Sequence, residues 1–353
     1  MDDTGVAAKF LNYLARRFDR AGLAYAEPPM RISGGYDASI FGFALADPPP
    51  PLGGPLILRL NRGGTDPQRI KLEGLIHNWL ASQNYPVPIV HVCELDAQPL
   101  GAPFTVMTRL AGKPLADDVN RAIGAGSAFA KARGLTRLPA IARELTDAWV
   151  DVQLKLHALD PSPLLAAAAA AGFDPAALTF EGQLSWLAGE VKRLALDGVQ
   201  PAIDWLLAHQ PTSLRPTVCH GDFHPLNILG DRGKISGVID WTNVVVAPAE
   251  MDVASAITNI ANVPFDVPRL LDPVLRLIVA RVLKNYRRAY AARRPLDDDA
   301  VRYFQVFRCI AQAVPVLRSR AAGVTYSGAF GSDAALANLV RYIHGLSGVS
   351  VRI

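Results

Sequence analysis

The sequence predicts a mixed α+β protein in two parts, a small sheet of about five strands with one helix, followed by a larger helical part. Three observations predict this. The chain has 353 residues, which is more than a single hydrophobic core usually organises. Strand patterns gather between residues 30 and 110, and helical periodicity dominates afterwards. We therefore expect a first lobe over residues 1–108 and a helical lobe over residues 109–353.

The elements of the first lobe can be read in order. Phe10, Leu14 and Phe18 lie at helical spacing and predict an amphipathic helix over residues 5–22. "RISGGYDASIFGFAL" predicts two strands around a glycine turn, and the prolines of "DPPPPLGGP" predict an exposed connection. "LILRL" predicts a buried strand. "TDPQRIKLEGLIHNWLA" predicts a helix, because Asp66 can cap it and Pro67 suits its first turn. "YPVPIVHVCEL" and "FTVMTRL" predict two further strands.

The second lobe begins with a long predicted helix, marked by apolar residues from Ile141 to Leu156. An alanine-rich stretch follows. Strand patterns return only between residues 213 and 246, and helices then run to the C-terminus. The acidic run 297–299 is typical of a helix N-terminus, where the helix dipole stabilises carboxylates.

Composition narrows the class of protein. Half of the residues are hydrophobic and 19% are charged, which is typical of folded globular proteins. The three cysteines, Cys93, Cys219 and Cys309, form no C-x-x-C pair and so fit a reducing cytoplasm. The N-terminus lacks the pattern of a signal peptide, and the alanine run is too short to span a bilayer. We expect a soluble, cytoplasmic protein that binds neither nucleic acid nor membranes; the sequence does not indicate its oligomeric state.

The stretch "HGDFHPLNIL" at residues 220–229 concentrates groups that carry chemistry. His220, Asp222 and His224 could form a metal cage of the kind found in hydrolases, although no further histidine has the spacing of an additional ligand. Alternatively, Asp222 is a base, and Asn227 and Asp240 are oxygen ligands for magnesium. Phosphoryl transfer needs these groups, and Asp222 and Asn227 follow the H-x-D-x-x-x-x-N order of a kinase catalytic loop.

"HGDFHPLNIL" together with "GVIDW" resembles the aminoglycoside phosphotransferase and choline kinase family of small-molecule kinases. In that family the first segment has the motif H-G-D-x-H-x-x-N, and the second has the motif I-D-W or I-D-F. The resemblance extends over nearly the whole chain, through "ISGGYDASIF", "LILRL", "KLEGLIHNWL", "FTVMTRLAGKPL", "LKLHALDP" and "PAEMDVA". It implies a protein-kinase-like fold of two lobes, with a small, mainly antiparallel sheet in the first. ATP or GTP and Mg2+ are the implied cofactors.

The resemblance also implies roles for individual residues. Asp222 would be the catalytic base, and Asn227 and Asp240 would hold magnesium. His220, His224 and Asp252 would support the catalytic loop. The pair Arg59 and Glu73 would bind the nucleotide. Gly34 and Gly35 of the glycine turn, and Met107 and Arg109 at the hinge, would bind it as well. The turn lacks the G-x-G-x-x-G of protein kinases.

Simpler interpretations exist for several of these residues. Taken alone, Arg59 could be a surface residue of a strand and Glu73 a solvated residue on the polar face of a helix. Asp252 could be the N-cap of the following helix, and "VAPAEMDVA" departs from the G-D-P-x-x-D-L-A pattern that the family usually shows there.

Charge bears on the molecule that accepts the phosphoryl group. Residues 261–353 contain 14 arginines and lysines and 6 aspartates, a net charge of +8, which leaves −4 for residues 1–260 out of the chain's +4. Aminoglycosides are polycations and call for carboxylates, so we expect a neutral or anionic hydroxyl compound as the acceptor. An antibiotic kinase, a nucleotide-binding sensor or scaffold without turnover, and a metallohydrolase are the alternatives.

Overall fold

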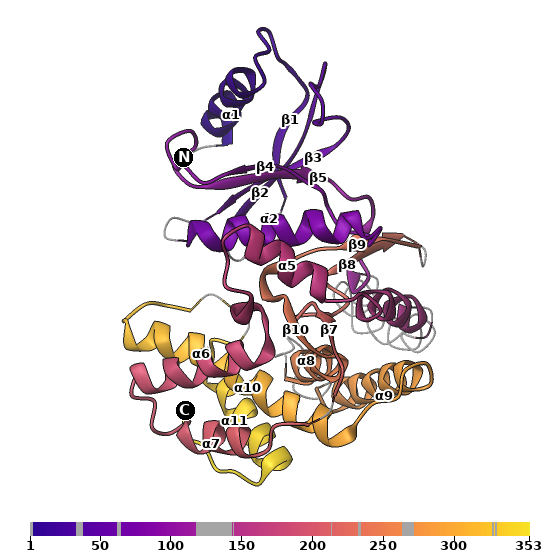
Figure 1. Ribbon diagram of the computed structural model, residues 1–353, viewed down its shortest axis with the longest axis vertical. Helices are drawn as coiled ribbons and strands as arrows, with labels where there is room; N and C mark the ends of the chain where they lie inside the picture. Colours follow the sequence, from indigo (N-terminus) through magenta and orange to yellow (C-terminus); the bar gives the residue numbers. More distant parts are fainter. Residues whose placement is uncertain are drawn as a thin grey trace. The chain divides into compact units, whose positions relative to one another are not determined.

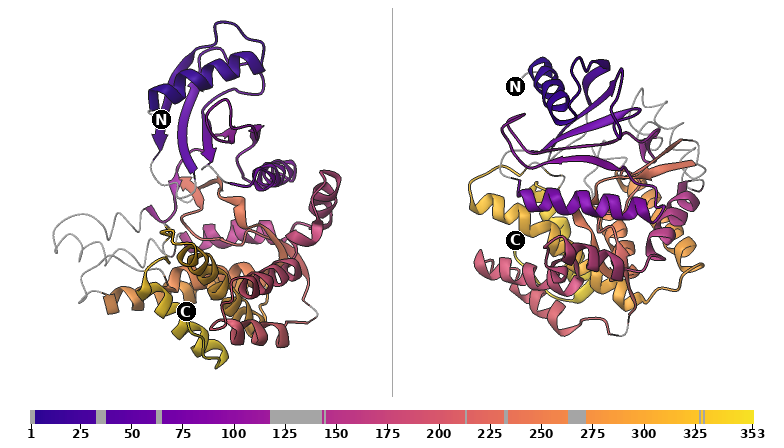
Figure 2. Two further views of the ribbon diagram at one scale, coloured as in Figure 1. Left: turned by 90° about the vertical axis from the view of Figure 1, so that its left-hand side faces the viewer. Right: turned by 45° about the horizontal axis from the view of Figure 1, so that its top comes forward.

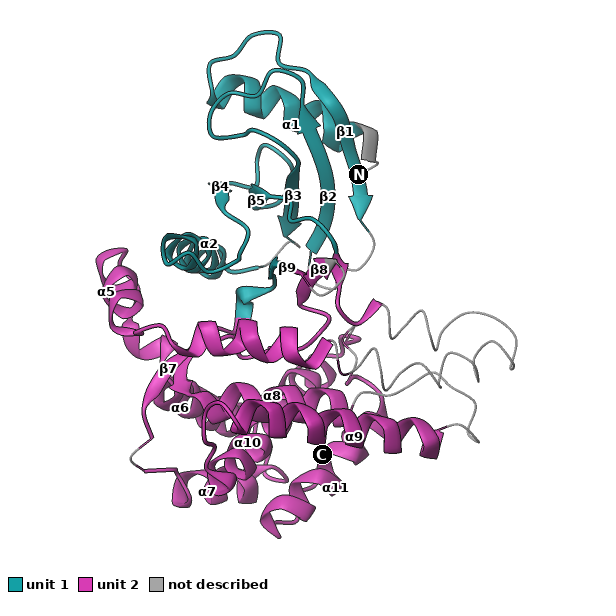
Figure 3. Cartoon of the chain, turned by 90° about the vertical axis from the view of Figure 1, so that its right-hand side faces the viewer, with its two compact units in different colours: residues 1–112, 236–242 teal, residues 113–235, 243–353 magenta. Residues whose placement is uncertain are grey.

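The computed structural model describes residues 3–32, 38–61, 65–117, 143, 145–212, 214–231, 234–262, 272–326, 328 and 330–353. The chain forms two compact units (Figure 3). Unit 1 comprises residues 1–112 and 236–242, and unit 2 comprises residues 113–235 and 243–353. A short segment from far along the sequence thus belongs to the N-terminal unit.

Unit 1 is built on a five-stranded sheet in which every pair of neighbours is antiparallel (Figure 1). The predicted strands are confirmed. Their order in the sheet is β1-β2-β3-β5-β4. Their bounds are Tyr25–Ile32 for β1, Ala38–Leu45 for β2, Leu56–Asn61 for β3, Val90–Glu94 for β4 and Phe104–Thr108 for β5.

The core of unit 1 lies between this sheet and helix α1 (Asp3–Arg17). Phe10 and Leu14 of the helix are fully buried, as are Phe41, Leu58 and Val106, which are neighbours across three strands. The helix ends before the predicted limit of residue 22, because the chain takes a left-handed turn at residue 19, where φ is 47°.

Helix α2 (Pro67–Ser82) packs against β4 and β5. Asp66 is its N-cap, as predicted, and accepts a hydrogen bond from the backbone N–H of Gln68. Successive side chains of a strand point to opposite faces. Arg59 therefore leaves the face that buries Leu58, and it reaches Glu73 of α2 instead.

Unit 2 is mainly helical and also has short antiparallel strands among the described residues. Strand β7 (Pro216–Cys219) pairs with β10 (Val245–Pro248), and β6 (Lys113–Pro114) pairs with β8 (Ile228–Asp231). The chain passes into unit 1 within β9 (Lys234–Val238) and returns within the short helix η2 (Trp241–Asn243).

The helices of unit 2 include the predicted long one, which covers residues 145–157. The others are α5 (Ser162–Ala170), η1 (Pro175–Leu178), α6 (Phe180–Arg193), α7 (Gln200–Ala208), α8 (Ala249–Asn262), α9 (Asp272–Ala291), α10 (Asp298–Ala321) and α11 (Asp333–Ser347). Asp297 caps α10, as the acidic run predicts.

The core of unit 2 is formed by helices α6, α7, α8, α10 and α11 together with β7 and β10. In Figure 2 the C-terminal helices, coloured from orange to yellow, gather in one bundle. None of the helices in the described part of the chain is long and apolar enough to cross a membrane. The bundle brings α8 and α10 into extensive contact, and both helices contribute side chains to the site described next.

Candidate functional site

The predicted catalytic loop, residues 220–227, leaves the end of β7 in unit 2. Gly221 has a φ of 79°, and a Cβ atom at this position would lie 2.1 Å from the carbonyl oxygen of Asn243. Only glycine fits here, because the conformation is strained for other residues and the neighbouring backbone leaves no room. The glycine of "HGD" is thus required by the path of the chain.

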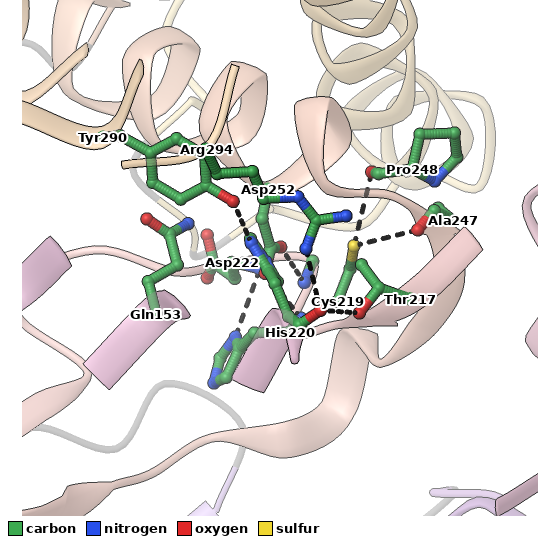
Figure 4. Close-up of polar contacts among 12 residues, drawn as sticks. Gln153, Thr217, Cys219, His220, Asp222, Ala247, Pro248, Asp252, Tyr290 and Arg294 are labelled. Carbon is green, nitrogen blue, oxygen red and sulfur yellow. Dashed lines mark hydrogen bonds and ion pairs between the residues drawn. The ribbon is translucent and has the colours of Figure 1, made fainter. Parts of the chain in front are cut away.

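Asp252 holds the backbone of this loop (Figure 4). Its Oδ2 accepts the N–H of His220 at 2.8 Å, and its Oδ1 accepts the N–H of Gly221 at 2.7 Å. The carboxylate is fully buried, and its Oδ2 also lies 3.1 Å from Nε2 of His157. The N-cap interpretation of Asp252 is wrong, because α8 begins at Ala249 and Asp252 lies within its first turn.

His157 extends this network to helix α9. Its Nδ1 lies 2.6 Å from the hydroxyl oxygen of Tyr290, and its carbonyl oxygen accepts hydrogen bonds from Thr217 and Arg294. Burial raises the pKa of Tyr290, so its hydroxyl stays protonated and can donate to Nδ1. With Nδ1 accepting from Tyr290, Nε2 is the ring nitrogen that can donate to Asp252. The network that holds the loop therefore joins three helices, namely residues 145–157, α8 and α9.

The side chain of Asp222 is surrounded by donors. Its Oδ1 lies 3.0 Å from Nη2 of Arg308 and 3.4 Å from Nε2 of His224, and it also accepts a hydrogen bond from Nδ2 of Asn259. Burial disfavours the charged carboxylate, but Arg308 and His224 outweigh it and hold the pKa of Asp222 well below its usual range. Asp222 is therefore an ionised carboxylate at neutral pH.

The two histidines of the loop contact Asp222 differently. His220 is fully buried, its Nδ1 accepts the N–H of Asp222 at 3.2 Å, and its ring meets Phe223 edge to face. His224 approaches the carboxylate itself. These are the contacts that a supporting role needs.

Two predicted metal ligands lie in different units. In unit 2, Asn227 is buried and its Nδ2 donates to the carbonyl oxygen of Asp222 at 3.0 Å, which leaves its Oδ1 available as a ligand. In unit 1, Asp240 is exposed and has a φ of 66°, and its Oδ1 accepts a hydrogen bond from Thr242. An amide oxygen and a carboxylate are hard oxygen donors of the kind that magnesium prefers, so the two residues fit this metal.

Arg59 and Glu73 form an ion pair within unit 1, between Nη1 and Oε1. Their side chains are only 17% and 14% exposed, so the simpler interpretation of Glu73 as a solvated residue is wrong. Burial opposes the ionised form of Glu73, but His77 and Arg59 outweigh it and lower its pKa. The pair links β3 to α2 within unit 1, and its role in binding phosphate stays a prediction.

A model of the phosphotransferase enzyme family matches residues 31–298, about three quarters of the chain. The chain belongs to the phosphotransferase enzyme family. The matched region contains the catalytic loop, Arg59, Glu73, Asp240 and Asp252. No match was found among curated protein sequences.

Solved structures resemble this phosphotransferase along its whole length. An aminoglycoside phosphotransferase candidate from Ralstonia eutropha JMP134 aligns with a TM-score of 0.61 and 16% identity, over 98% of this chain and 99% of that one. A thermostable mutant of aminoglycoside phosphotransferase APH(4)-Ia, in a ternary complex with ADP and hygromycin B, gives a TM-score of 0.60 and 17% identity over 96% and 97%. A macrolide 2'-phosphotransferase type I gives 0.53 and 18% over 98% and 97%. At these identities the likeness shows the fold alone, and it confirms the predicted kinase-like α+β class.

Of the remaining residues predicted to bind nucleotide, Gly34 and Gly35 lie outside the described residues. Met107 is buried in β5, and Arg109 follows this strand, with its backbone N–H bonded to the carbonyl oxygen of Pro55. Arg109 also contributes to a cavity of about 370 Å³ within unit 1 of the phosphotransferase. Its lining consists of Ala26, Glu27, Pro28, Met30, Arg31, Ile32, Gly42 and Arg109.

The metal-cage interpretation finds no support in the described part of the phosphotransferase. The one group of histidine, cysteine and acidic side chains there with ligand atoms close together is His157, Cys219 and Asp252. All three already form hydrogen bonds, since the Cys219 thiol donates to the carbonyl oxygens of Ala247 and Pro248. His220, Asp222 and His224 are not such a group.

Three side chains near Asp222 were missed by the sequence reasoning, namely Asn259, Arg308 and Gln312. The sequence does contain a signal for two of them, Arg308 and Gln312. Gln305, Arg308 and Gln312 recur at helical spacing within an otherwise apolar stretch, and such a polar stripe on a buried helix indicates a polar partner.

Proposed function

We propose that this protein transfers the γ-phosphoryl group of ATP, or of GTP, to a hydroxyl group of a small neutral or anionic molecule. The observation that carries the proposal is the half-buried, ionised carboxylate of Asp222 on a loop that Asp252 braces. The relatives of known structure include complexes of APH(4)-Ia with ADP and with AMP-PNP, which supports an adenine nucleotide.

In the proposed reaction, Asp222 accepts a hydrogen bond from the acceptor hydroxyl and takes its proton. A carboxylate of such low pKa is a weak base, so it receives the proton late, as the new bond to phosphorus forms. Its main contribution is to orient the hydroxyl for in-line attack. Arg59, held by Glu73, binds phosphate oxygens through its forked donors.

Asn227 and Asp240 would hold the magnesium ion, and its positive charge would offset the charge on the phosphate groups. His220 and His224 keep the loop and its aspartate in place. Asp252 acts through the loop backbone and does not take part in the chemistry.

The acceptor class is argued from charge. The guanidinium of Arg308 lies 3.0 Å from the proposed base, and the C-terminal residues 261–353 carry a net charge of +8. An ammonium group beside the reacting hydroxyl would meet this guanidinium and be repelled. A neutral or anionic acceptor avoids this cost. The aminoglycoside and macrolide phosphotransferases of similar fold make an antibiotic kinase the second candidate.

The acceptor class is tested with pairs of hydroxyl compounds that differ only in whether one amine is free or acetylated. We expect acetylation to raise kcat/KM by about tenfold, equivalent to about 1.4 kcal/mol, because it removes the repelled charge. ADP release is measured with ATP or GTP and magnesium. A preference for the free amine contradicts the acceptor class and favours the antibiotic kinase. Nucleotide binding without turnover on any acceptor favours the sensor or scaffold.

The phosphate-binding role of Arg59 gives a separate prediction. Arg59→Ala should raise the KM for nucleotide by about tenfold, because a charge-assisted contact to phosphate is lost. Arg59→Lys should recover part of the loss. Arg69→Ala removes the same charge from the exposed side of α2 and serves as the control. An unchanged nucleotide KM in Arg59→Ala would exclude the role, provided that the variant keeps the parent's melting temperature.

A further inference from the structure

Three contacts to the carboxylate of Asp222 converge on one of its two oxygens. Arg308 of α10, Asn259 of α8 and His224 of the loop all approach Oδ1. Among the residues that the structure describes, none forms a hydrogen bond or ion pair with Oδ2. The polar contacts of the described residues therefore hold the carboxylate by Oδ1.

The orientation of Asn259 is fixed by its own neighbours. Its Oδ1 accepts hydrogen bonds from Nε of Arg308, at 3.0 Å, and from Nε2 of Gln312. An amide oxygen that accepts two donors leaves the NH2 group on the opposite side, where it donates to Asp222. The assignment of the amide atoms follows from this pattern.

Helix geometry puts Arg308 and Gln312 together. They are four residues apart in α10 and so lie one above the other on the same face, where both reach Asn259 of α8. Asn259 and Gln312 are buried, and the side chain of Arg308 is 17% exposed. Hydrogen bonds between largely buried side chains restrict their rotamers, so Arg308 and Gln312 hold the amide of Asn259 in this orientation.

We propose that Arg308, Asn259 and Gln312 are positioning residues that hold Oδ1 of Asp222, so that Oδ2 faces the acceptor hydroxyl. This inference rests on the proposed function. It identifies Oδ2 as the atom that acts as the base. It also gives Arg308 a positioning role in addition to its contribution to packing. A catalytic group held in place by neighbouring side chains loses little entropy when the reacting geometry forms.

The step at this atom is as follows. The acceptor oxygen forms a bond to the γ-phosphorus, and its proton passes to Oδ2 of Asp222. The bond from the γ-phosphorus to the oxygen that bridges to the β-phosphate breaks, and the nucleoside diphosphate leaves with that electron pair. The proton is afterwards released to solvent, which restores the carboxylate.

The test compares Arg308→Ala and Arg308→Lys with the parent, using an acceptor on which the parent turns over. We expect Arg308→Ala to lower kcat by about 10²-fold, because a misplaced reacting group costs about this much, while nucleotide KM stays within about twofold. Arg308→Lys should retain more activity than Arg308→Ala. Millimolar guanidinium should restore part of the activity of Arg308→Ala but not raise that of the parent.

Arg302→Ala is the control, because Arg302 lies on the same helix, is exposed and pairs only with Asp299 among the described residues. It should leave kcat unchanged. A kcat of Arg308→Ala equal to the parent's would overturn the inference and leave the proposed function intact. A lower kcat that neither lysine nor guanidinium rescues, together with a lower melting temperature, would also overturn it, in favour of a structural role. Absence of turnover by the parent on every acceptor would overturn both.

Discussion

Replacing Asp222 with asparagine is expected to lower kcat by about 10³-fold, within the range that loss of a general base produces. The amide has nearly the shape of the carboxylate and can keep a hydrogen bond from Arg308 through its oxygen. It can still meet the hydroxyl but cannot take its proton. Nucleotide KM should stay within about twofold, because the residues proposed to bind the nucleotide lie in unit 1.

The measurement is steady-state ADP release with a turned-over acceptor. Asp272→Asn is the matched control, since it makes the same chemical change at a surface residue of α9 that pairs with Arg276. Such a surface pair contributes little, so this variant should behave as the parent does. Equal kcat values for Asp222→Asn and the parent would show that the assignment of the base is incorrect.

Replacing Asp252 with alanine is expected to destabilise the protein by about 3–5 kcal/mol. The change leaves the buried N–H groups of His220 and Gly221 without acceptors and removes the partner of His157. Each unsatisfied buried donor costs about 1–3 kcal/mol. The turnover of the remaining folded protein should fall as well, because the loop that carries Asp222 loses its support.

Urea unfolding at constant pH measures the first effect. Ser255→Ala provides the control in the same helix, because the buried Ser255 hydroxyl has no hydrogen-bond partner among the described residues and its loss should be neutral or stabilising. A free energy of unfolding of Asp252→Ala within about 1 kcal/mol of the parent's would mean that the carboxylate does not brace the loop.

Much of unit 1 could be predicted from local patterns. Strands β3 and β4 begin with alternating buried and less buried positions, and Asp66 with Pro67 marks the start of α2. The pairing of Arg59 with Glu73 is harder to predict, because it depends on which face of the sheet the helix covers. The resemblance to a family indicated both residues, and the structure provides the contact.

The side chains of α8 and α10 that contact Asp222 could not be predicted from the sequence, because they are far from it along the chain. Arg308 lies 86 residues further along the chain, and only the packing of α8 against α10 brings it close. Helical spacing shows that Arg308 and Gln312 share a face, but it does not show what that face meets. Asp252 was ambiguous in another way, since an acid near a helix start suits both a cap and the first turn.

The central claim is that the protein moves a phosphoryl group to a hydroxyl and that Asp222 orients this hydroxyl. Phosphorus NMR of a reaction with ATP, magnesium and an acceptor tests it most directly. The account predicts a new phosphomonoester signal that grows in step with ADP for the parent and is absent over the same time for Asp222→Asn. ADP accompanied only by inorganic phosphate, or an equal phosphomonoester signal from both proteins, would contradict it.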